Sequence, residues 1–189
     1  ESKGPAFFLP TLFSTLFSLI LSVFFISHAR PPTNPTTPTK PTTMILEMAS
    51  LELMPHSVSM FLDMVHAGLF DGCSFVLMAM HMIKLAPLPY DGSSASAKVR
   101  SFTKHGLETV AFREYSSEFP HEQYTVAFAA DGSPSFFINT QDNSEIHVGE
   151  PCFARSVSGF DTVERLASAP TRGGIWYRRR IGLKHAVIL

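Results

Sequence analysis

Cysteine is scarce in this sequence, and so are the patterns that mark metal sites. Two cysteines among 189 residues, Cys73 and Cys152, form at most one disulfide, which excludes a disulfide-stapled scaffold but is compatible with a secretory compartment. His81, His105 and His147 do not have the spacing of metal ligands. We therefore expect no metal and no other cofactor.

The motifs of two hydrolase classes are also missing. His121-Glu122 lacks the second histidine of a zinc-protease helix, because position 125 is threonine. Ser133, His121 and Asp131 have the residue types of a hydrolase triad, but no Gly-x-Ser-x-Gly nucleophile motif accompanies them. Neither kind of hydrolase is predicted.

Charge of one sign is not concentrated in this chain. From Met44 to the C-terminus there are 15 acidic and 12 basic side chains, a net charge of −3, and the longest run of one sign is Arg178-Arg179-Arg180. Nucleic-acid binding requires a basic surface, so it is not expected. The arginine triplet is interpreted as an exposed edge or loop before the last strand.

The N-terminal part, in contrast, contains a long hydrophobic run. Phe7 to Ile26 carries no charge, and about 20 helical residues cross the roughly 30 Å hydrocarbon layer of a membrane. We expect residues 1–29 to be a single-pass anchor in the secretory pathway, at the endoplasmic reticulum, the Golgi or the cell surface. The alternatives are a signal peptide cleaved after Ala29, which would give a secreted protein, and a buried core helix.

Residues 30–43 are rich in proline and threonine. Proline fixes φ and removes a backbone donor, so an extended polyproline II stalk without a packed core is predicted. At about 3.1 Å per residue, this stalk would hold the following domain roughly 40 Å from the membrane. A docking site for a proline-recognition module is the alternative to a solvated linker.

The rest of the chain has the pattern of one domain with two short helices. Pro55 and Ser57 open the first helix, Gly68 ends it, and its apolar stripe consists of Val58, Phe61, Leu62 and Val65. Asp161 is predicted to cap the second helix, with Glu164 three residues later in the position of a capping box. Both helices should pack against a sheet.

Short apolar runs predict the strands of that sheet. They are Ile45 to Met48, Ser74 to Ile83, Thr125 to Ala129, Ser135 to Asn139, Cys152 to Val157 and Gly182 to Leu189. Many short strands with two separated helices favour a closed antiparallel β-barrel with helices at its ends. Leu85 to Gly106 contains prolines and a Ser/Ala run, and is predicted to be a long surface loop.

Several motifs follow one another in a recognisable order through residues 44–189. They are Glu52 to Leu62, Gly68 to Phe75, Gly132 to Ile138, Cys152 to Arg155 and Gly159 to Val163. In this order they resemble the cyclophilin-type peptidyl-prolyl cis-trans isomerase family. The resemblance implies an eight-stranded barrel capped by two short helices, a monomeric domain, and a proline-containing polypeptide as partner.

The resemblance also implies a chemistry, and this sequence departs from it. Rotation about an X-Pro bond has a barrier of about 18–20 kcal/mol because amide resonance must be broken. The catalyst supplies an apolar pocket and a donor that stabilises the twisted amide, and in the family this donor is an arginine that follows Phe-His. Here Phe75 matches the phenylalanine, Val76 stands at the histidine and Leu77 at the arginine.

Other site positions of the family differ as well. In the same register, Met82 falls at a pocket phenylalanine and Leu85 at the glutamine that holds the substrate backbone. A gapless reading places Glu145, Ile146 and Glu150 at the late tryptophan, leucine and histidine. Leucine donates no hydrogen bond, so two of the polar groups that the family uses are lost.

We therefore expect a membrane-tethered domain of this isomerase family with weak or absent catalysis. A proline or apolar peptide is expected to bind against four side chains: Phe137, Met82, Ile146 and Phe75. For Phe137 and Met82 the alternative is simple packing in the core. For the whole protein the alternative is a non-catalytic peptide-binding or scaffold module of the secretory pathway.

Overall fold

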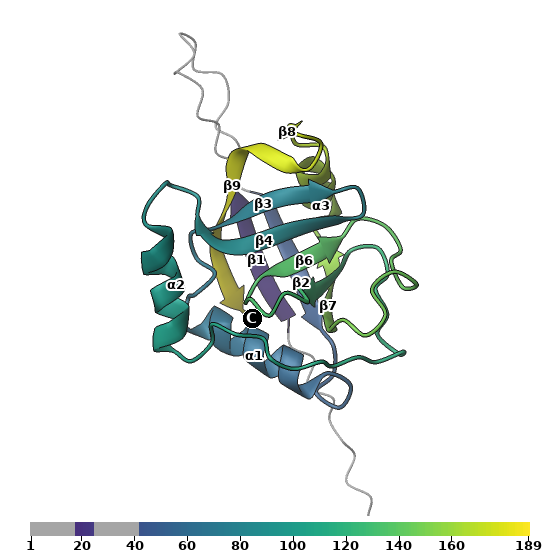
Figure 1. Ribbon diagram of the computed structural model, residues 1–189. Coiled ribbons are helices and arrows are strands. Elements are labelled where there is room, and N and C mark those ends of the chain that lie inside the picture. Colours follow the sequence, from purple (N-terminus) through teal and green to yellow (C-terminus); the bar gives the residue numbers. More distant parts are fainter. Residues whose placement is uncertain (1–17, 25–41) are drawn as a thin grey trace, which may run out of the picture.

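The computed structural model describes residues 18–24 and 42–189. In this part of the chain, nine antiparallel strands form one curled sheet in the order β1-β2-β7-β5-β6-β4-β3-β9-β8, and β1 pairs with β9 as well as with β2 (Figure 1). The strands are β1 Ser18–Phe24, β2 Thr42–Met48, β3 Cys73–Ala79, β4 Met82–Pro89, β5 Thr125–Phe128, β6 Phe136–Asn139, β7 Cys152–Ser158, β8 Thr171–Arg172 and β9 Trp176–Ile188. The expected mainly β, antiparallel architecture is confirmed.

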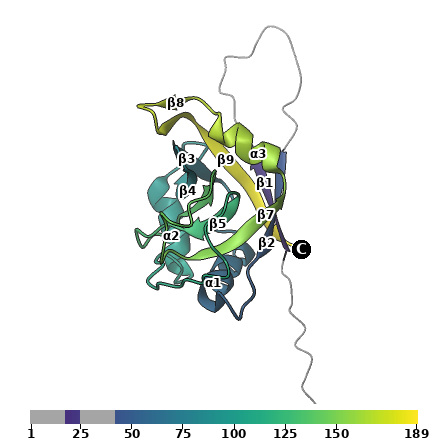
Figure 2. The same ribbon diagram turned by 90° about the vertical axis from the view of Figure 1, so that its right-hand side faces the viewer.

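Two of the three helices lie at opposite ends of the curled sheet (Figures 1 and 2). Helix α1, Pro55–His66, begins with proline at its first position, where the missing N–H has no intrahelical partner to lose. It buries Val58, Phe61, Met64 and Val65 at helical spacing. The stripe predicted from the sequence therefore faces the sheet, with Met64 added and Leu62 only partly buried.

Aromatic side chains fill the interior between α1 and the sheet. The ring of Phe61 lies 4.7 Å from that of Phe153 and 5.5 Å, edge to face, from that of Phe136. Phe70 packs edge to face on the same Phe136 ring at 5.2 Å. Edge-to-face and tilted pairs are the favoured aromatic arrangements, so this cluster fixes the helix on the sheet.

Helix α3, Phe160–Ala167, begins differently from the prediction. Its N-cap is Gly159, in the left-handed conformation with φ 84°, and no side chain caps the first turn. Asp161 lies within the first turn, where a carboxylate still favours the helix dipole. Glu164 accepts a hydrogen bond from the Tyr124 hydroxyl at 2.7 Å instead of closing a capping box.

Helix α2, Ala95–Lys104, lies within the segment predicted as a surface loop, and that prediction is wrong. Ser94 caps the helix by accepting from the Ala97 N–H at 3.3 Å, and Phe102 is its one buried residue. A Ser/Ala-rich stretch competes with its own backbone for hydrogen bonds and reads as a loop. The predicted loop also starts too early, since β4 continues to Pro89.

Two strand boundaries also differ from the prediction. The run from Ser74 to Ile83 is a hairpin of β3 and β4 that turns at residues 80–81, not one strand. The final strand starts at Trp176, so the arginine triplet 178–180 lies inside β9 and not before it. The two-residue strand β8 pairs with the start of β9 and projects from the body of the molecule (Figure 2).

Seven residues of the predicted membrane anchor are described, and they form strand β1 instead of a helix. Ile20, Val23 and Phe24 are β-branched or aromatic residues, which favour strands as well as apolar helices, and this explains the difference. The flanking residues 1–17 and 25–41, which include the predicted cleavage site and most of the stalk, lie outside the described residues. Among the described residues, no helix combines the length and hydropathy needed to span a membrane.

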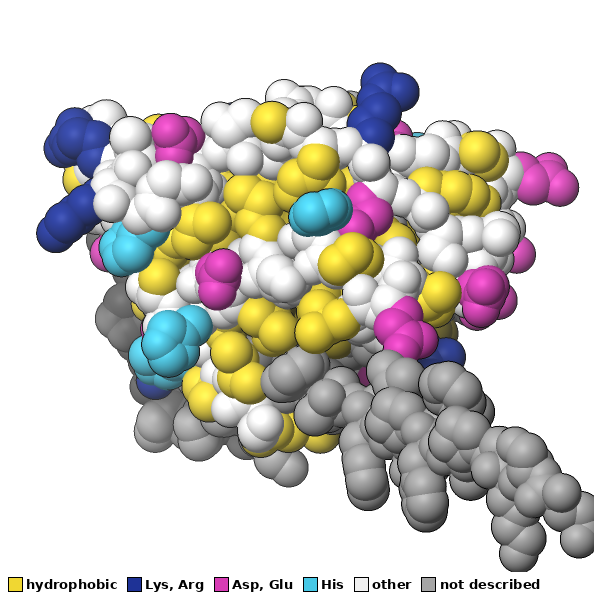
Figure 3. Space-filling view, turned by 90° about the horizontal axis from the view of Figure 1, so that it is seen from below, with side chains coloured by type: hydrophobic (Ala, Val, Ile, Leu, Met, Phe, Trp, Pro, Cys, Tyr) yellow, Lys and Arg dark blue, Asp and Glu magenta, His cyan; other side chains and the backbone are white. Residues whose placement is uncertain are grey.

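The face seen from the α1 end carries no large patch of one charge. Hydrophobic side chains extend across its middle and are interrupted by acidic and histidine side chains, with Lys and Arg at the edges (Figure 3). Such mixing of charges is typical of an ordinary solvated surface.

Candidate functional site

The predicted site residues divide between the two faces of the sheet. Directly paired residues of neighbouring strands point to the same side, and one such row runs through Leu77, Lys84, Phe137, Ala127 and Cys152. This row faces away from the main core, because Ala127, Phe137 and Cys152 form a separate small cluster. We call this side of the sheet the outer face.

Phe75 and Leu85 lie on the opposite face. They pair with each other across β3 and β4, Leu85 pairs with Phe136, and both side chains are fully buried in the main core. A one-residue change of register moves a side chain to the other face of a strand. The outward positions of β4 are therefore Met82 and Lys84, and the predicted group of four peptide contacts is not brought together.

Phe137 lies on the outer face but is covered. Its side chain is 2% exposed, with Met82 and Phe119 packed against its cluster. The ring of His121 stacks parallel to it at 5.9 Å, and the ring of His147 tilts against it at 5.0 Å. The aromatic floor predicted for a proline pocket therefore has protein side chains on it.

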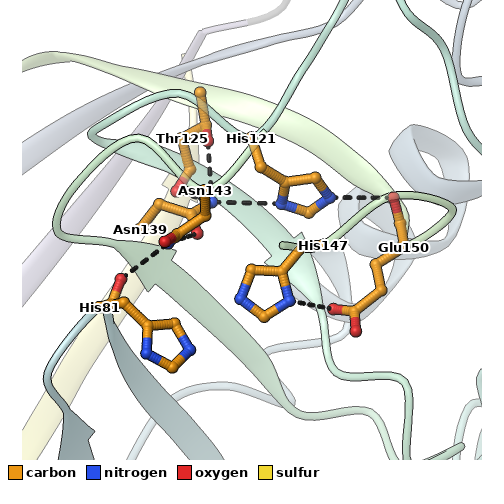
Figure 4. A network of polar contacts seen from close by, with 7 residues as sticks. All are labelled: His81, His121, Thr125, Asn139, Asn143, His147 and Glu150. Atoms are coloured by element: carbon orange, nitrogen blue, oxygen red, sulfur yellow. Dashed lines mark hydrogen bonds and ion pairs between the residues drawn. The ribbon is translucent and has the colours of Figure 1, made fainter. Parts of the chain in front are cut away.

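A hydrogen-bond network holds this cover in place (Figure 4). Asn139, at the end of β6, donates its amide to Thr125 Oγ1 at 2.9 Å and to His121 Nδ1 at 3.3 Å. Asn143 donates to Asn139 Oδ1 at 2.6 Å and to the carbonyl oxygen of His81 at 2.8 Å. The network thus ties the β3–β4 turn and the segment after β6 to one buried point.

The network also assigns the protonation of His121. Because Nδ1 accepts from Asn139, Nε2 carries the proton and donates to the carbonyl oxygen of Glu150 at 3.1 Å. Burial is the largest cause that lowers the pKa of His121, and it outweighs the opposing bond to Glu150. Burial, followed by the charge of His147, also lowers the pKa of His81. Both imidazoles are therefore neutral at pH 7.

The segment after β6 contains Glu145, Ile146 and Glu150, which the sequence alignment placed at the family's late tryptophan, leucine and histidine. Ile146 is 60% exposed and Glu145 is exposed, so neither covers Phe137. Glu150 Oε2 lies 3.2 Å from His147 Nδ1, and His147 Nε2 is buried with no partner. His147 is therefore a second polar side chain over the ring, and no sequence motif indicates it because its neighbours come from three separate segments.

Lys84 is the second group that sequence reasoning missed. It stands on the outer face between Leu77 and Phe137, and its ammonium is paired with Asp131 at 2.5 Å. Burial acts to raise the pKa of Asp131, but hydrogen bonds from Lys84 and Ser133 outweigh it and the pKa is lowered. Successive side chains of a strand point to opposite faces, so the apolar Ile83 and Leu85 could have indicated that Lys84 points outward.

No group of three or more metal-ligating side chains gathers among residues 42–189. Cys73 and Cys152 are both buried and free, and burial raises the pKa of each thiol to about 12. They are therefore protonated, inert parts of the core.

The curled antiparallel sheet, the capping helices and the Phe137 element define the class of protein. The model of the family described as cyclophilin type peptidyl-prolyl cis-trans isomerase matches residues 38–188. This chain belongs to that family.

Solved structures give the same fold. A crystal structure of a cyclophilin type peptidyl-prolyl cis-trans isomerase from Cryptosporidium parvum superposes with a TM-score of 0.66 at 14% identity, covering 92% of this chain and 98% of that one. The same enzyme in the presence of the dipeptide Ala-Pro gives a TM-score of 0.60 at 18% identity, over 78% of this chain and 92% of that one. No curated protein matches the sequence at a significant level.

Proposed function

We propose that this chain is a cyclophilin-type domain with little or no peptidyl-prolyl isomerase activity. The observation that carries the proposal is the outer face around Phe137, where the ring is 2% exposed and Leu77 stands at the position of the family's arginine. Lys84 is the cation nearest to this position along the strands, and Asp131 already holds its ammonium. The leucine side chain at this position donates no hydrogen bond to a twisted amide.

The size of the defect follows from the chemistry. Loss of one preorganised donor commonly lowers the rate by about 10²–10³-fold, or roughly 3–4 kcal/mol in activation free energy. Coverage of the pocket floor by His147 adds a cost, because the side chain must move before a proline ring enters. We expect a rate constant for cis-to-trans conversion at least about 10³-fold below that of an ordinary member of the family.

The test is an isomerase assay with the full chain and an Ala-Pro peptide. A conversion rate equal to the uncatalysed rate of the peptide alone, in a preparation whose circular dichroism shows a folded sheet, supports the proposal. Turnover near that of an ordinary family member contradicts it. As a control, a fully active member of the family is assayed in the same buffer and detergent.

The partner class we propose is a proline-containing polypeptide, bound by a monomeric domain. The Cryptosporidium parvum relative studied with the dipeptide Ala-Pro supports this choice. Binding here requires displacement of His147, so affinity should be low. If the isomerase assay gives no turnover, the remaining function is a non-catalytic peptide-binding or scaffold role in the secretory pathway.

We further propose that the uncharged run from Phe7 to Ile26 tethers the domain to a membrane of the secretory pathway. Its length and lack of charge support the tether. The tether and strand β1 use the same residues, so they are alternative states of Ser18–Phe24. Retention of the full chain in membranes after alkaline carbonate extraction supports the tether, and complete release contradicts it.

A further inference from the structure

The outer face also contains a groove beside the covered Phe137 ring, and this groove shares Leu77 and Lys84 with the candidate site. Strands β3 and β9 pair at Phe75–Ile181 and again at Leu77–Trp176. Between these pairs β9 has the four residues 177–180, whereas β3 has Val76 alone. The strands therefore part, and a groove of about 540 Å³ lies between them and the neighbouring β4.

The floor and walls of this β3–β9 groove are mostly apolar. Val76, Leu77, Ala86 and Leu88 contribute from β3 and β4, and Trp176 and Tyr177 contribute from β9. Trp176 is 48% exposed and is the one tryptophan of the chain. A half-exposed tryptophan beside an apolar groove offers a large, rigid contact surface for a ligand.

The charged residues of the groove have an excess of positive charge. Lys84 and Asp131 neutralise each other as a pair. Arg180 is positioned by a hydrogen bond from Nη1 to the carbonyl oxygen of Pro89 at 2.5 Å, and Arg172 is exposed on β8 at the other side of the groove. Within residues 42–189, no carboxylate forms an ion pair with either arginine. Arg180 and the exposed carboxylate of Asp91 attract each other through their charges without an ion pair, so both guanidinium groups remain able to pair with a carboxylate of a ligand.

Two glycines hold Arg172 next to Trp176. The β8–β9 hairpin turns at Gly173 and Gly174, with φ of 60° and 82°, and Arg172 pairs directly with Trp176. Residues other than glycine rarely adopt such angles. The guanidinium and the indole are thereby presented on one short hairpin at the groove, which projects from the molecule in Figure 2.

We propose that the β3–β9 groove binds an extended peptide segment that carries one carboxylate flanked by apolar side chains. The flanking side chains pack on the apolar floor and on Trp176, and Arg172 and Arg180 donate charge-assisted hydrogen bonds to the carboxylate. Asp131 and the net charge of −3 over residues 44–189 oppose a polyphosphate such as nucleic acid. This inference does not depend on the isomerase activity.

The chain provides its own probe for the test, since Trp176 is the single source of tryptophan emission. The capped peptide Ala-Leu-Glu-Leu-Ala is titrated into the full chain, followed by its Gln counterpart, at low and at 0.5 M salt. We expect a change in emission that saturates, with the Glu peptide binding at least about tenfold more tightly than the Gln peptide at low salt. Salt should reduce this ratio, because it screens the charge interaction.

Variants identify the site. R172Q should weaken binding of the Glu peptide about tenfold and leave the Gln peptide unchanged, whereas the matched control R100Q, on α2, should alter neither. R172E should bind a Lys peptide more tightly than the Glu peptide. Equal affinity of the wild type for the Glu and Gln peptides, or no saturable emission change up to millimolar peptide, overturns the proposal. An excess of Ala-Pro dipeptide should not compete, because the Phe137 ring, against which a proline would pack, does not line this groove.

Discussion

At the scale of single residues, the buried histidines make stability depend on pH. Burial lowers the pKa of His121 below the ordinary value of 6.5. It also lowers the pKa of His81, which is less buried. A lowered pKa in the folded state means that the unfolded chain takes up protons first as the pH falls. Stability is therefore fully present above about pH 6.5 and declines below it, by at most about 1.4 kcal/mol per pH unit for His121 and by less for the more exposed, solvent-screened His81.

Thermal melts at pH 7.5, 6.5 and 5.5 check this prediction. The melting temperature should change little from pH 7.5 to 6.5 and fall from pH 6.5 to 5.5, and H121Q should show a smaller fall than the wild type. The carboxyls of Asp91, Asp131 and Asp142 have lowered pKa values and titrate below this window. A melting temperature that stays constant or rises from pH 7.5 to 5.5 contradicts the role of the histidines.

Gly159 provides a second test at this scale. A Cβ at this position would lie 2.3 Å from the carbonyl oxygen of Thr43, and φ is 84°. G159A should therefore lower the free energy of unfolding by about 3 kcal/mol, from the left-handed backbone and the clash with β2 together. The control G92A, with φ 83° and open space, should cost only about 1 kcal/mol. Equal losses in urea unfolding would show that the contact with Thr43 is unimportant.

At the scale of elements, the start of α1 depends on a residue far along the chain. Glu114 accepts from the N–H of His56 at 3.0 Å and from the N–H of Ser57 at 2.7 Å, so a carboxylate caps the helix that has no cap of its own. E114A should lower the free energy of unfolding by about 1–2 kcal/mol. E118A, an exposed glutamate of the same connection, should have no measurable effect. A helix that tolerates E114A without loss would refute the capping role.

Elements were predictable where one residue pattern determined them. The stripe of α1 and the runs of β5, β6 and β7 follow helical or strand periodicity, and the structure contains them within a few residues. Helix α2 was missed because Phe102 is its one buried residue and its Ser/Ala-rich sequence resembles a loop. The two-residue strand β8 is too short to leave a pattern at all.

The candidate site was harder to predict than the fold, because its geometry is set by long-range pairing. Gapless counting from Phe75 placed Leu85 at the substrate, but Leu85 pairs with Phe75 and Phe136 on the core side of the sheet and its side chain is fully buried. His121 and His147 meet at Phe137 from segments with no shared motif. The sequence therefore predicted a site at Phe137, which stays a prediction, and did not indicate the side chains that cover this ring.

At the scale of the whole molecule, β1 joins both ends of the described sheet. It pairs with β2 on one side and with β9 on the other. Deletion of residues 1–24 should leave both neighbours with unpaired backbone groups and lower the free energy of unfolding by at least about 3 kcal/mol. Urea unfolding and size-exclusion chromatography of the deletion variant and the full chain measure the effect. Identical unfolding curves would mean that Ser18–Phe24 does not serve as a strand.

The pairing of Val23 with Thr42 has a consequence for everything between them. Adjacent strands are about 4.8 Å apart, so the chain leaves the sheet and re-enters it at nearly the same point. Because doubling a loop costs only about 0.6 kcal/mol, a fluorescent protein or an affinity label inserted there should be carried by the folded domain with little penalty.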